Sequence, residues 1–231
     1  MSSEKRRIVV LASGTPTGGG SGFEWLVEAT RTGVIPNAEV VAVISNRMSG
    51  GVNARADRLG IPFCWTCGIP LADRTRYSTY VKMYEPDLTC LSGCLWPISE
   101  PDPAKVINIH PGPLPEFGGP GMYGHHVHEA VMAAYLRGKI TQSAVTMHFV
   151  TEEYDAGPVF FRYPVAIRPD DTAESLGARV NEVEHGWQSF ITSLVLNGEI
   201  WYNALSGRVI VKPNVHRALH HFFRPGSVVV V

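Results

Sequence analysis

The sequence predicts an α/β fold: a Rossmann-like, mostly parallel sheet flanked by helices, with an antiparallel extension in the C-terminal third. The first observation is that short β-rich runs alternate with amphipathic helical patterns through the first two-thirds of the chain. This spacing is typical of right-handed βαβ units, which build parallel sheets. The second observation is that residues 143–150 and 158–167 alternate as strands, with too little chain between them for a helix. Two strands joined so closely are expected to pair antiparallel.

The elements of the parallel part follow from their apolar patterns. Residues 7–12 contain the apolar run Ile8–Leu11 and are expected to be the first strand, and a glycine-rich loop follows them. Residues 21–32 carry apolar side chains at helical spacing and predict the first helix. Ligands of such sheets bind beyond the carboxyl ends of the strands, so functional loops should follow Ala12, Leu91 and Ile109. Later runs predict strands at 40–45, 62–65, 88–91 and 105–109, and helices at 53–59 and 75–83.

The C-terminal third adds a long helix and a hairpin. We expect a helix over 172–195, because Asp171 or Thr172 can cap its free N–H groups. Residues 201–211 predict a hairpin that turns at Ser206-Gly207. The sequence shows no internal repeat and no linker long enough to divide it. We therefore expect one domain over residues 1–231.

The composition argues against several classes of protein. The 231 residues include 20 Lys and Arg against 21 Asp and Glu, which leaves a net charge of −1. Without a basic excess, binding to nucleic acid through phosphate neutralisation is not expected. No apolar run reaches the roughly 18 residues that a membrane span needs, and the N-terminal apolar run is too short for a signal peptide. These features predict a cytoplasmic protein with no membrane partner.

The spacing of the four cysteines is only weak evidence for a redox pair or a metal site. Cys64 and Cys67 have the spacing of a redox pair or of half a zinc site. Cys90 and Cys94 fit the second half of a zinc site poorly, and no helix start follows Cys67 as a thioredoxin-like site would require. We therefore expect buried or incidental thiols in a reducing compartment.

The loop before the first helix is rich in glycine and suits an anion. Glycines let the backbone approach a ligand closely, and the free N–H groups of a helix start favour a negative charge. Gly20 stands where the phosphate loop of nucleotide hydrolases has a Lys, and Phe23 stands where the dinucleotide fingerprint has its third glycine. The remaining interpretation is a monophosphate held by backbone N–H groups and Ser21. The alternative is a surface loop without a ligand.

A strand end carries the most informative polar residues. Asn108 and His110 are two residues apart, so both side chains point to the same side of the strand that Pro111 ends. An amide can stabilise a developing oxyanion and an imidazole can move protons, a combination suited to acyl transfer. Asp155 lies in a later turn that can place its carboxylate over His110. The alternatives are a polar pair that satisfies loop backbone and a surface Asx-turn.

Together these segments resemble the folate-dependent formyltransferases. The resemblance rests on the first strand with its glycine loop, on Asn-Ile-His-Pro at 108–111, and on Met-His-Phe-Val-Thr-Glu-Glu-Tyr-Asp-Ala-Gly-Pro at 147–158. It runs in order from about residue 7 to residue 207. Within the family, the chain is most similar to members that formylate glycinamide ribonucleotide in purine synthesis. The resemblance implies that 10-formyltetrahydrofolate is the formyl donor.

The resemblance also implies roles for single residues. Asn108 and His110 would stabilise the tetrahedral oxyanion, while Asp155 positions His110 and assists proton transfer. Arg74 or Arg76 would supply a cation near the acceptor phosphate. The phosphate and the rest of the acceptor would be bound by Gly20, Ser21, Gly22 and Glu184. The pterin would lie along Leu95, Trp96, Pro97, Ile98, Val150, Thr151 and Tyr154, mainly on backbone groups.

The chain departs from the usual family pattern at several positions. Gly22 stands where the family usually has Asn, and Gly112 where it commonly has Ser. Trp96 replaces a common Arg, and Pro97 beside it lacks the N–H group that a pterin could use. The resemblance implies a cis bond before Pro115.

The partners follow from the same resemblance. We expect small-molecule substrates, no metal, and a monomer or homodimer. No set of Cys or carboxylate ligands completes a metal site in the His-rich segment at 121–128. We expect a loop and a helix start there, with His126 or His128 near the substrate cleft. We expect residues 1–105 to be the phosphate and acceptor half, and residues 106–231 the catalytic and folate-binding half. The alternatives are a formyltransferase for another amine such as a nucleotide-linked amino sugar, a formyltetrahydrofolate hydrolase, and a non-catalytic phosphate- or nucleotide-binding module.

Overall fold

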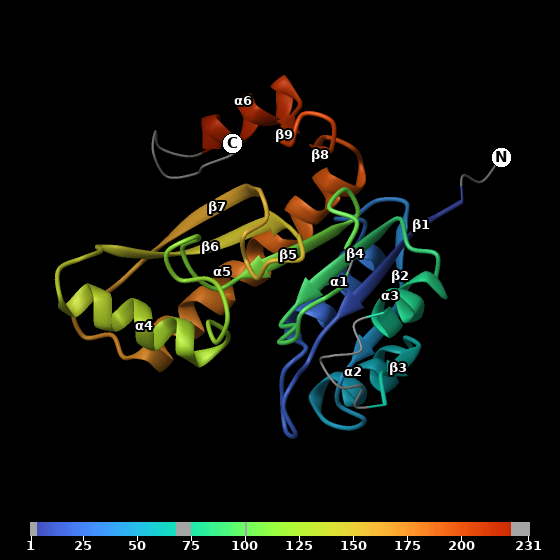
Figure 1. The fold of residues 1–231 in the computed structure, drawn as a ribbon, viewed down its shortest axis with the longest axis horizontal. Helices are drawn as coiled ribbons and strands as arrows, with labels where there is room; N and C mark the ends of the chain where they lie inside the picture. The colour runs from blue at the N-terminus through green and yellow to red at the C-terminus, as the bar shows by residue number, and fades with distance from the viewer. Residues whose placement is uncertain (1–3, 68–74, 100, 223–231) are drawn as a thin grey trace.

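A seven-stranded sheet forms the centre of the computed structural model, which describes residues 4–67, 75–99 and 101–222 (Figure 1). The strand order is β3-β2-β1-β4-β5-β6-β7, and a separate two-stranded sheet pairs β8 with β9. The strands are β1 (Arg6–Leu11), β2 (Ala38–Ser45), β3 (Phe63–Trp65), β4 (Leu88–Ser92), β5 (Val106–His110), β6 (Gln142–Phe149), β7 (Val159–Ala166), β8 (Ile200–Asn203) and β9 (Arg208–Val211). The helices are α1 (Ser21–Thr32), α2 (Gly51–Leu59), α3 (Thr75–Lys82), α4 (His125–Leu136), α5 (Ala173–Leu196) and α6 (Pro213–Phe222).

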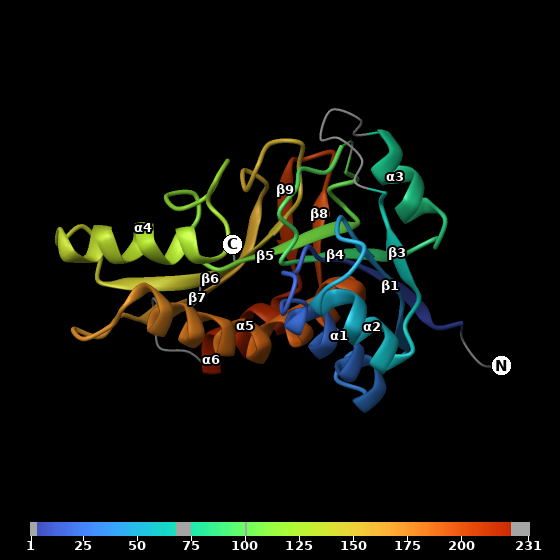
Figure 2. The ribbon, with the colours of Figure 1, turned by 90° about the horizontal axis from the view of Figure 1, so that it is seen from below.

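The predicted fold class is confirmed. Strands β1 to β5 pair in parallel, whereas β6 pairs antiparallel with both β5 and β7. Helices α1, α2 and α5 lie on one face of the sheet, and α3 lies on the opposite face (Figure 2). The β8–β9 pair is the antiparallel hairpin expected near Ser206-Gly207.

The alternation of β1 explains why helices cover both faces. Ile8 and Val10 belong to the larger core cluster, which includes Phe23 of α1. Val9 and Leu11 point the other way, into a second cluster that contains Trp96. All four β1 side chains are fully buried. A strand buried on both faces is an apolar run, the pattern that the sequence shows here.

Most predicted boundaries lie within one or two residues of the observed ones. Helix α1 has the predicted bounds, and Thr172 is the N-cap of α5, with a capping box to Ser175. Asp171 accepts hydrogen bonds from Arg179, which ties the same helix end to its second turn. The Leu114–Pro115 bond is cis, as the resemblance implied.

Two helices were not predicted in full. The sequence indicated only a loop and a helix start within 121–128, whereas α4 runs from His125 to Leu136. Helix α6 was not predicted at all. Buried Val127 and Val131 lie one turn apart on α4, but the histidines before them obscured that pattern. None of the helices that the structure describes is long and apolar enough to cross a membrane.

Candidate active site

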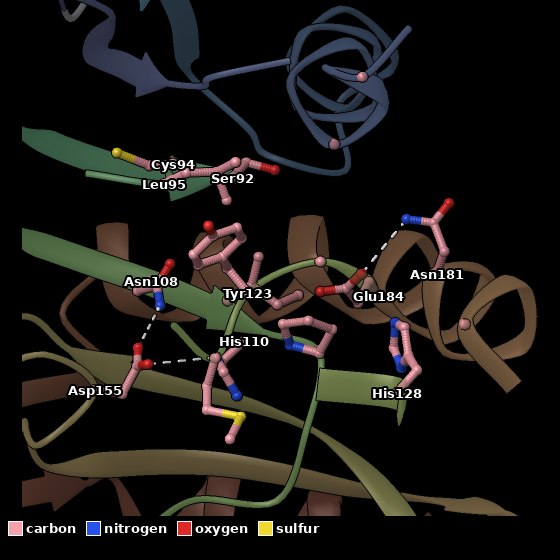
Figure 3. A pocket seen from close by; sticks show the side chains of 18 of the residues that line it. Ser92, Cys94, Leu95, Asn108, His110, Tyr123, His128, Asp155, Asn181 and Glu184 are labelled. Carbon is pink, nitrogen blue, oxygen red and sulfur yellow. Dashed lines mark hydrogen bonds and ion pairs between the residues drawn. The ribbon is translucent and has the colours of Figure 1, made fainter. Parts of the chain in front are cut away.

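A cavity of about 370 Å³ opens at the carboxyl ends of β1, β4 and β5. The loops after these strands, which the sequence predicts to be functional, all line this cavity. Helix α5 and the segment before α4 close the cavity from the other sides (Figure 3). Its walls include Ser21, Ser92, Asn108, His110, Tyr123, His128, Asp155, Asn181, Glu184 and Gln188.

The glycine loop brings the start of α1 to one end of this cavity. Gly20 is the N-cap residue and has a left-handed backbone with φ 79°, a conformation that glycine adopts at little cost. No side chain caps this helix start, so its first N–H groups remain available to a ligand. The hydroxyl of Ser21 lies 3.0 Å from His185 Nε2, and burial lowers the pKa of His185. Gly20, Ser21 and Gly22, the residues predicted to bind phosphate, all line this cavity.

Asn108 is held by a neighbouring strand. Its Nδ2 donates to His148 Nε2 at 3.0 Å and lies 3.4 Å from Asp155 Oδ1. His148 Nδ1 donates to the carbonyl oxygen of Phe149 at 3.0 Å, which fixes the orientation of the ring. His148 is buried and pairs directly with Asn108 across β5 and β6. These contacts fix the Asn108 amide with its NH₂ group toward Asp155.

His110 lies between a backbone carbonyl and a carboxylate. Its Nε2 donates to the carbonyl oxygen of Phe117 at 2.8 Å, and its Nδ1 lies 3.7 Å from Asp155 Oδ2. Asp155 Oδ2 also accepts the N–H of Gly119 at 3.0 Å. The structure thus brings together Asn108, His110 and Asp155, the three residues predicted for catalysis (Figure 3).

The pKa values of His110 and Asp155 depend on the balance between burial and the hydrogen bonds and charges around them. Burial lowers the pKa of His110, although the Asp155 charge and the Phe117 carbonyl oppose the shift. For Asp155, burial alone would raise the pKa. Hydrogen bonding to His148, the charge of His110 and the Gly119 N–H outweigh burial, and the pKa falls below its ordinary value. Asp155 is therefore ionised at neutral pH. Its backbone in this turn is left-handed, with a φ of 52°.

Gly157 allows this turn to approach β6. A Cβ atom at Gly157 would lie 1.8 Å from the carbonyl oxygen of Phe149, so the backbone would have to shift to accept any other residue at this position. We expect Gly157→Ala to lower the free energy of unfolding by about 1–3 kcal/mol or more. Gly186→Ala on α5 is the matched control, because a Cβ there meets nothing within 4 Å. That variant should gain about 0.5–1 kcal/mol from helix propensity. Urea denaturation measures both, and equal stabilities would contradict the close approach at Gly157.

Glu184 projects from α5 into the same cavity. Asn181 Nδ2 lies 3.4 Å from Glu184 Oε2, and both side chains are labelled in Figure 3. Burial raises the pKa of Glu184 to about 7, against a smaller opposing effect of the Asn181 bond. The carboxyl group therefore titrates near neutral pH, within the cavity that also contains His110.

This pKa predicts a pH-dependent stability. A carboxyl group whose pKa rises on folding stabilises the fold at low pH, and this contribution is lost as the pH rises through the folded pKa. The free energy of unfolding of Glu184→Gln minus that of wild type should therefore increase with pH. We expect this difference to rise by about 2 kcal/mol between about pH 5 and about pH 8. Glu182→Gln, at an exposed position of the same helix, is the control and should show no such growth. Urea denaturation at both pH values measures the difference, and a constant offset for Glu184→Gln would contradict the assignment.

A second, narrower cleft of about 50 Å³ adjoins the first. Buried Trp96, Ile98 and Val150 form its apolar side, and Thr151 and Tyr154 lie on the loop opposite. Pro97 also lines this cleft, whereas Leu95 lines the larger cavity. The two spaces share Cys94, Asn108, Tyr154 and Asp155.

Some predicted positions are not brought to the site by the described part of the chain. Arg74 lies outside the described residues, as does the side chain of Arg76. Of His126 and His128, one of which was expected near the cleft, His128 lines the cavity, whereas His126 is exposed and bonds to Glu129 at 3.2 Å. Among the described residues, no group of three or more His, Cys, Asp or Glu side chains is placed to hold a metal ion. All four cysteines are free thiols.

Sequence reasoning missed several residues that line the two spaces. His148 lies in the motif at 147–158, but the sequence indicated no role for it. Its contact with Asn108 depends on the antiparallel register of β5 with β6. Ser92 and Gln188 also went unnoticed, although Gln188 follows Glu184 by one helical turn, a spacing that could have found it. The Phe117 carbonyl and the Gly119 N–H are backbone groups and leave no signal in the sequence.

Comparison with known proteins agrees with this architecture. The family model described as formyl transferase matches residues 6–193. The trifunctional purine biosynthetic protein adenosine-3 of Gallus gallus is 32% identical over 86% of this chain and 19% of its own length. The chloroplastic phosphoribosylglycinamide formyltransferase of Arabidopsis thaliana is 33% identical over 78% of this chain and 62% of its own. The chain thus spans less than two-thirds of both relatives. It covers 88% of the Escherichia coli phosphoribosylglycinamide formyltransferase, at 29% identity.

Solved structures share the fold over most of the chain. The phosphoribosylglycinamide formyltransferase of Coxiella burnetii has a TM-score of 0.75 and 29% identity, covering 90% of this chain and 94% of that one. A formyltetrahydrofolate deformylase from Pseudomonas syringae has a TM-score of 0.71 but 23% identity, covering 91% of this chain and 67% of that one. This second likeness shows the fold alone. The family match extends over most of the sequence, including the segments that form both cavities, and the chain belongs to the formyl transferase family.

Proposed function

We propose that this chain transfers the formyl group of 10-formyltetrahydrofolate to the amine of glycinamide ribonucleotide. The observation that carries the proposal is that the two cavities meet at Asn108 and Asp155. Transfer of a one-carbon group between two bound molecules requires both to reach the same side chains. The names of the relatives support this acceptor and a place in purine synthesis.

The larger cavity suits the acceptor. In this proposal the phosphate binds the free N–H groups at Gly20, Ser21 and Gly22, where the α1 macrodipole also favours an anion. Glu184 lies farther along α5 and contacts the ribose or glycinamide part. Arg74 or Arg76 supplies a cation near the phosphate in this proposal.

The narrower cleft suits the donor. We place the pterin against the apolar side formed by Trp96 and Ile98, with backbone groups of the loop at Val150, Thr151 and Tyr154 opposite. Leu95 and Pro97 border the same path. The formyl group then extends toward Asn108, where the cleft opens into the larger cavity.

Formation of the tetrahedral intermediate uses Asn108 and His110. The acceptor nitrogen attacks the formyl carbon, and the carbonyl oxygen takes up the negative charge. The Asn108 NH₂ group donates to this oxygen in place of its long 3.4 Å contact with Asp155. The bond to His148 keeps the amide in the required orientation. Protonated His110 donates from Nδ1, since its Nε2 is bonded to the Phe117 carbonyl.

Collapse of the intermediate completes the transfer. The bond between the carbon and N10 of the folate breaks, N10 takes a proton, and the acceptor nitrogen loses one. Asp155 is ionised and lies 3.7 Å from His110, so it stabilises the imidazolium and accepts the proton that the acceptor amine releases. In this role Asp155 positions His110 and assists the proton transfer.

The proposal covers the whole chain as one formyltransferase domain, 1–231. Both halves contribute to both spaces, since Trp96 lines the donor cleft and Glu184 the acceptor cavity. Small-molecule substrates, a cytoplasmic location and a monomer or homodimer are parts of the same proposal.

Consumption of the formyl donor with and without acceptor tests the function. We expect 10-formyltetrahydrofolate to be consumed only when glycinamide ribonucleotide is present. Consumption without any amine would contradict formyl transfer and favour the hydrolase. Binding of the folate without turnover on this ribonucleotide would contradict the acceptor and favour another amine, such as a nucleotide-linked amino sugar.

A further inference from the structure

We propose that the side-chain amide of Gln188 recognises the phosphate of the acceptor, oriented by Ser92 and given its space by Gly22. The identity of the ligand rests on the proposed function, but the contact itself rests on the geometry of three residues from separate elements. These residues lie on α5, β4 and α1 and line the larger cavity.

Gly22 permits the close approach of these elements. A Cβ atom at Gly22 would lie 2.0 Å from Ser92 Oγ and 2.7 Å from Gln188 Oε1. Any side chain at this position would therefore displace both groups. The first turn of α1 thus packs directly on a serine hydroxyl and an amide, beside the N–H groups expected to bind phosphate.

Ser92 holds one side of the amide and leaves the other side free. Ser92 Oγ donates to Gln188 Oε1 at 3.3 Å, and the two residues are 6% and 2% exposed. Among the described residues, no hydrogen bond to the Gln188 NH₂ group is found. Gln188 lines the cavity, where an amide NH₂ group can donate to a ligand, so a ligand oxygen in the cavity is the partner that we infer.

The position of Gln188 on α5 places it at the phosphate end of the cavity. Asn181, Glu184 and Gln188 follow one another at spacings of three and four residues, so they share one face of the helix. Glu184 precedes Gln188 by one turn, and Gln188 lies against Gly22 at the start of α1. Along α5, Glu184 therefore faces the middle of the acceptor, and Gln188 faces the phosphate-binding loop.

The described residues at this end of the cavity offer neutral donors. No Lys or Arg is found among the described residues that line the cavity. Backbone N–H groups and an amide NH₂ can still bind a phosphate, since hydrogen bonds to a charged oxygen are stronger than those between neutral groups. Gln188 adds a side-chain donor to the backbone donors of the loop.

The test replaces the amide by an apolar group of similar size. We expect Gln188→Leu to raise the KM for glycinamide ribonucleotide by about 10-fold or more, the effect of losing a hydrogen bond to a charged group. The kcat and the KM for 10-formyltetrahydrofolate should stay within about twofold, because Gln188 does not line the narrower cleft proposed for the donor. Gln142→Leu is the matched control, since Gln142 is exposed on β6 and should change no constant.

A phosphate-free acceptor separates recognition from a structural role. Glycinamide riboside, which lacks the phosphate, should show the same KM with wild type and with Gln188→Leu. An equal rise in KM for both acceptors would overturn the phosphate contact, as would an unchanged KM for the ribonucleotide. If thermal unfolding shows that Gln188→Leu does not fold, Gln188→Glu keeps the shape. Its carboxylate should repel the phosphate and raise that KM further, and an unchanged KM in this variant would also overturn the proposal.

Binding of ribose 5-phosphate tests the contact without any turnover. We expect calorimetry to show that Gln188→Leu binds ribose 5-phosphate with about 10-fold lower affinity than wild type. This result would support the contact even if wild type failed to formylate glycinamide ribonucleotide, which would contradict only the proposed function. Equal affinities for wild type and variant would overturn the contact, whatever the activity.

Discussion

Replacing Asn108 with alanine is expected to lower kcat for formyl transfer by about 10²- to 10³-fold, the loss typical of removing one oxyanion donor. The physical reason is that the Asn108 NH₂ group is already oriented before substrate binds. Its bond to His148 Nε2 is 3.0 Å long, and His148 is itself fixed by the Phe149 carbonyl. A donor held in place in this way costs no reorganisation when charge develops on the formyl oxygen.

Steady-state kinetics with glycinamide ribonucleotide measures this loss. The KM of each substrate should change much less than kcat, because Asn108 contributes mainly in the transition state. Asn53→Ala is a suitable control, since Asn53 lies on α2 and lines neither cavity. An Asn108→Ala enzyme with near-normal kcat would exclude Asn108 as an oxyanion donor.

Asp155→Asn is expected to have a comparable or larger effect, lowering kcat by about 10²- to 10⁴-fold. The change removes the negative charge 3.7 Å from His110 Nδ1 and 3.5 Å from His148 Nε2. The Asp155 charge opposes the lowering of the His110 pKa by burial, so its loss should lower that pKa further. His110 would then carry a proton less often at neutral pH and stabilise the oxyanion less well.

The pH dependence of kcat gives this variant a distinct signature. The pKa of Asp155 lies below its ordinary value, so the wild-type carboxylate should stay ionised into the mildly acidic range. In Asp155→Asn, the remaining activity should shift toward lower pH, where His110 regains its proton. Asp170→Asn at an exposed position is the control and should keep the wild-type profile. A reduced kcat with an unchanged profile would indicate that Asp155 has only a structural role.

The sequence predicted most of the fold because the patterns that specify it are local. The run at 7–12 is apolar on both sides, as a central parallel strand requires, and the structure buries both sides. Thr172 was expected to cap a helix and does so. Helix α4 was only partly predicted, since three histidines in its first turn break the apolar periodicity before Val131. Its position depends on tertiary packing against α5, where His128 lies close to Gly177.

The candidate site was predictable only where its residues share one strand. Asn108 and His110 could be placed together because side chains two apart on a strand point the same way. Asp155 was expected near His110 because it lies in a turn after a later strand, and the structure shows its contacts with both residues. His148 reaches Asn108 through the register of β5 with β6, and Gln188 reaches Gly22 through the packing of α5 on α1. Such contacts between distant segments are set by tertiary structure, which a local pattern does not encode.

The fate of the formyl group tests the central claim most directly. Wild-type protein would be incubated with glycinamide ribonucleotide and with 10-formyltetrahydrofolate that carries an isotopic label in its formyl carbon, and the products would be identified by mass spectrometry. We predict that one labelled formylglycinamide ribonucleotide forms for each folate consumed. Label recovered as free formate, with the ribonucleotide unchanged, would contradict the account.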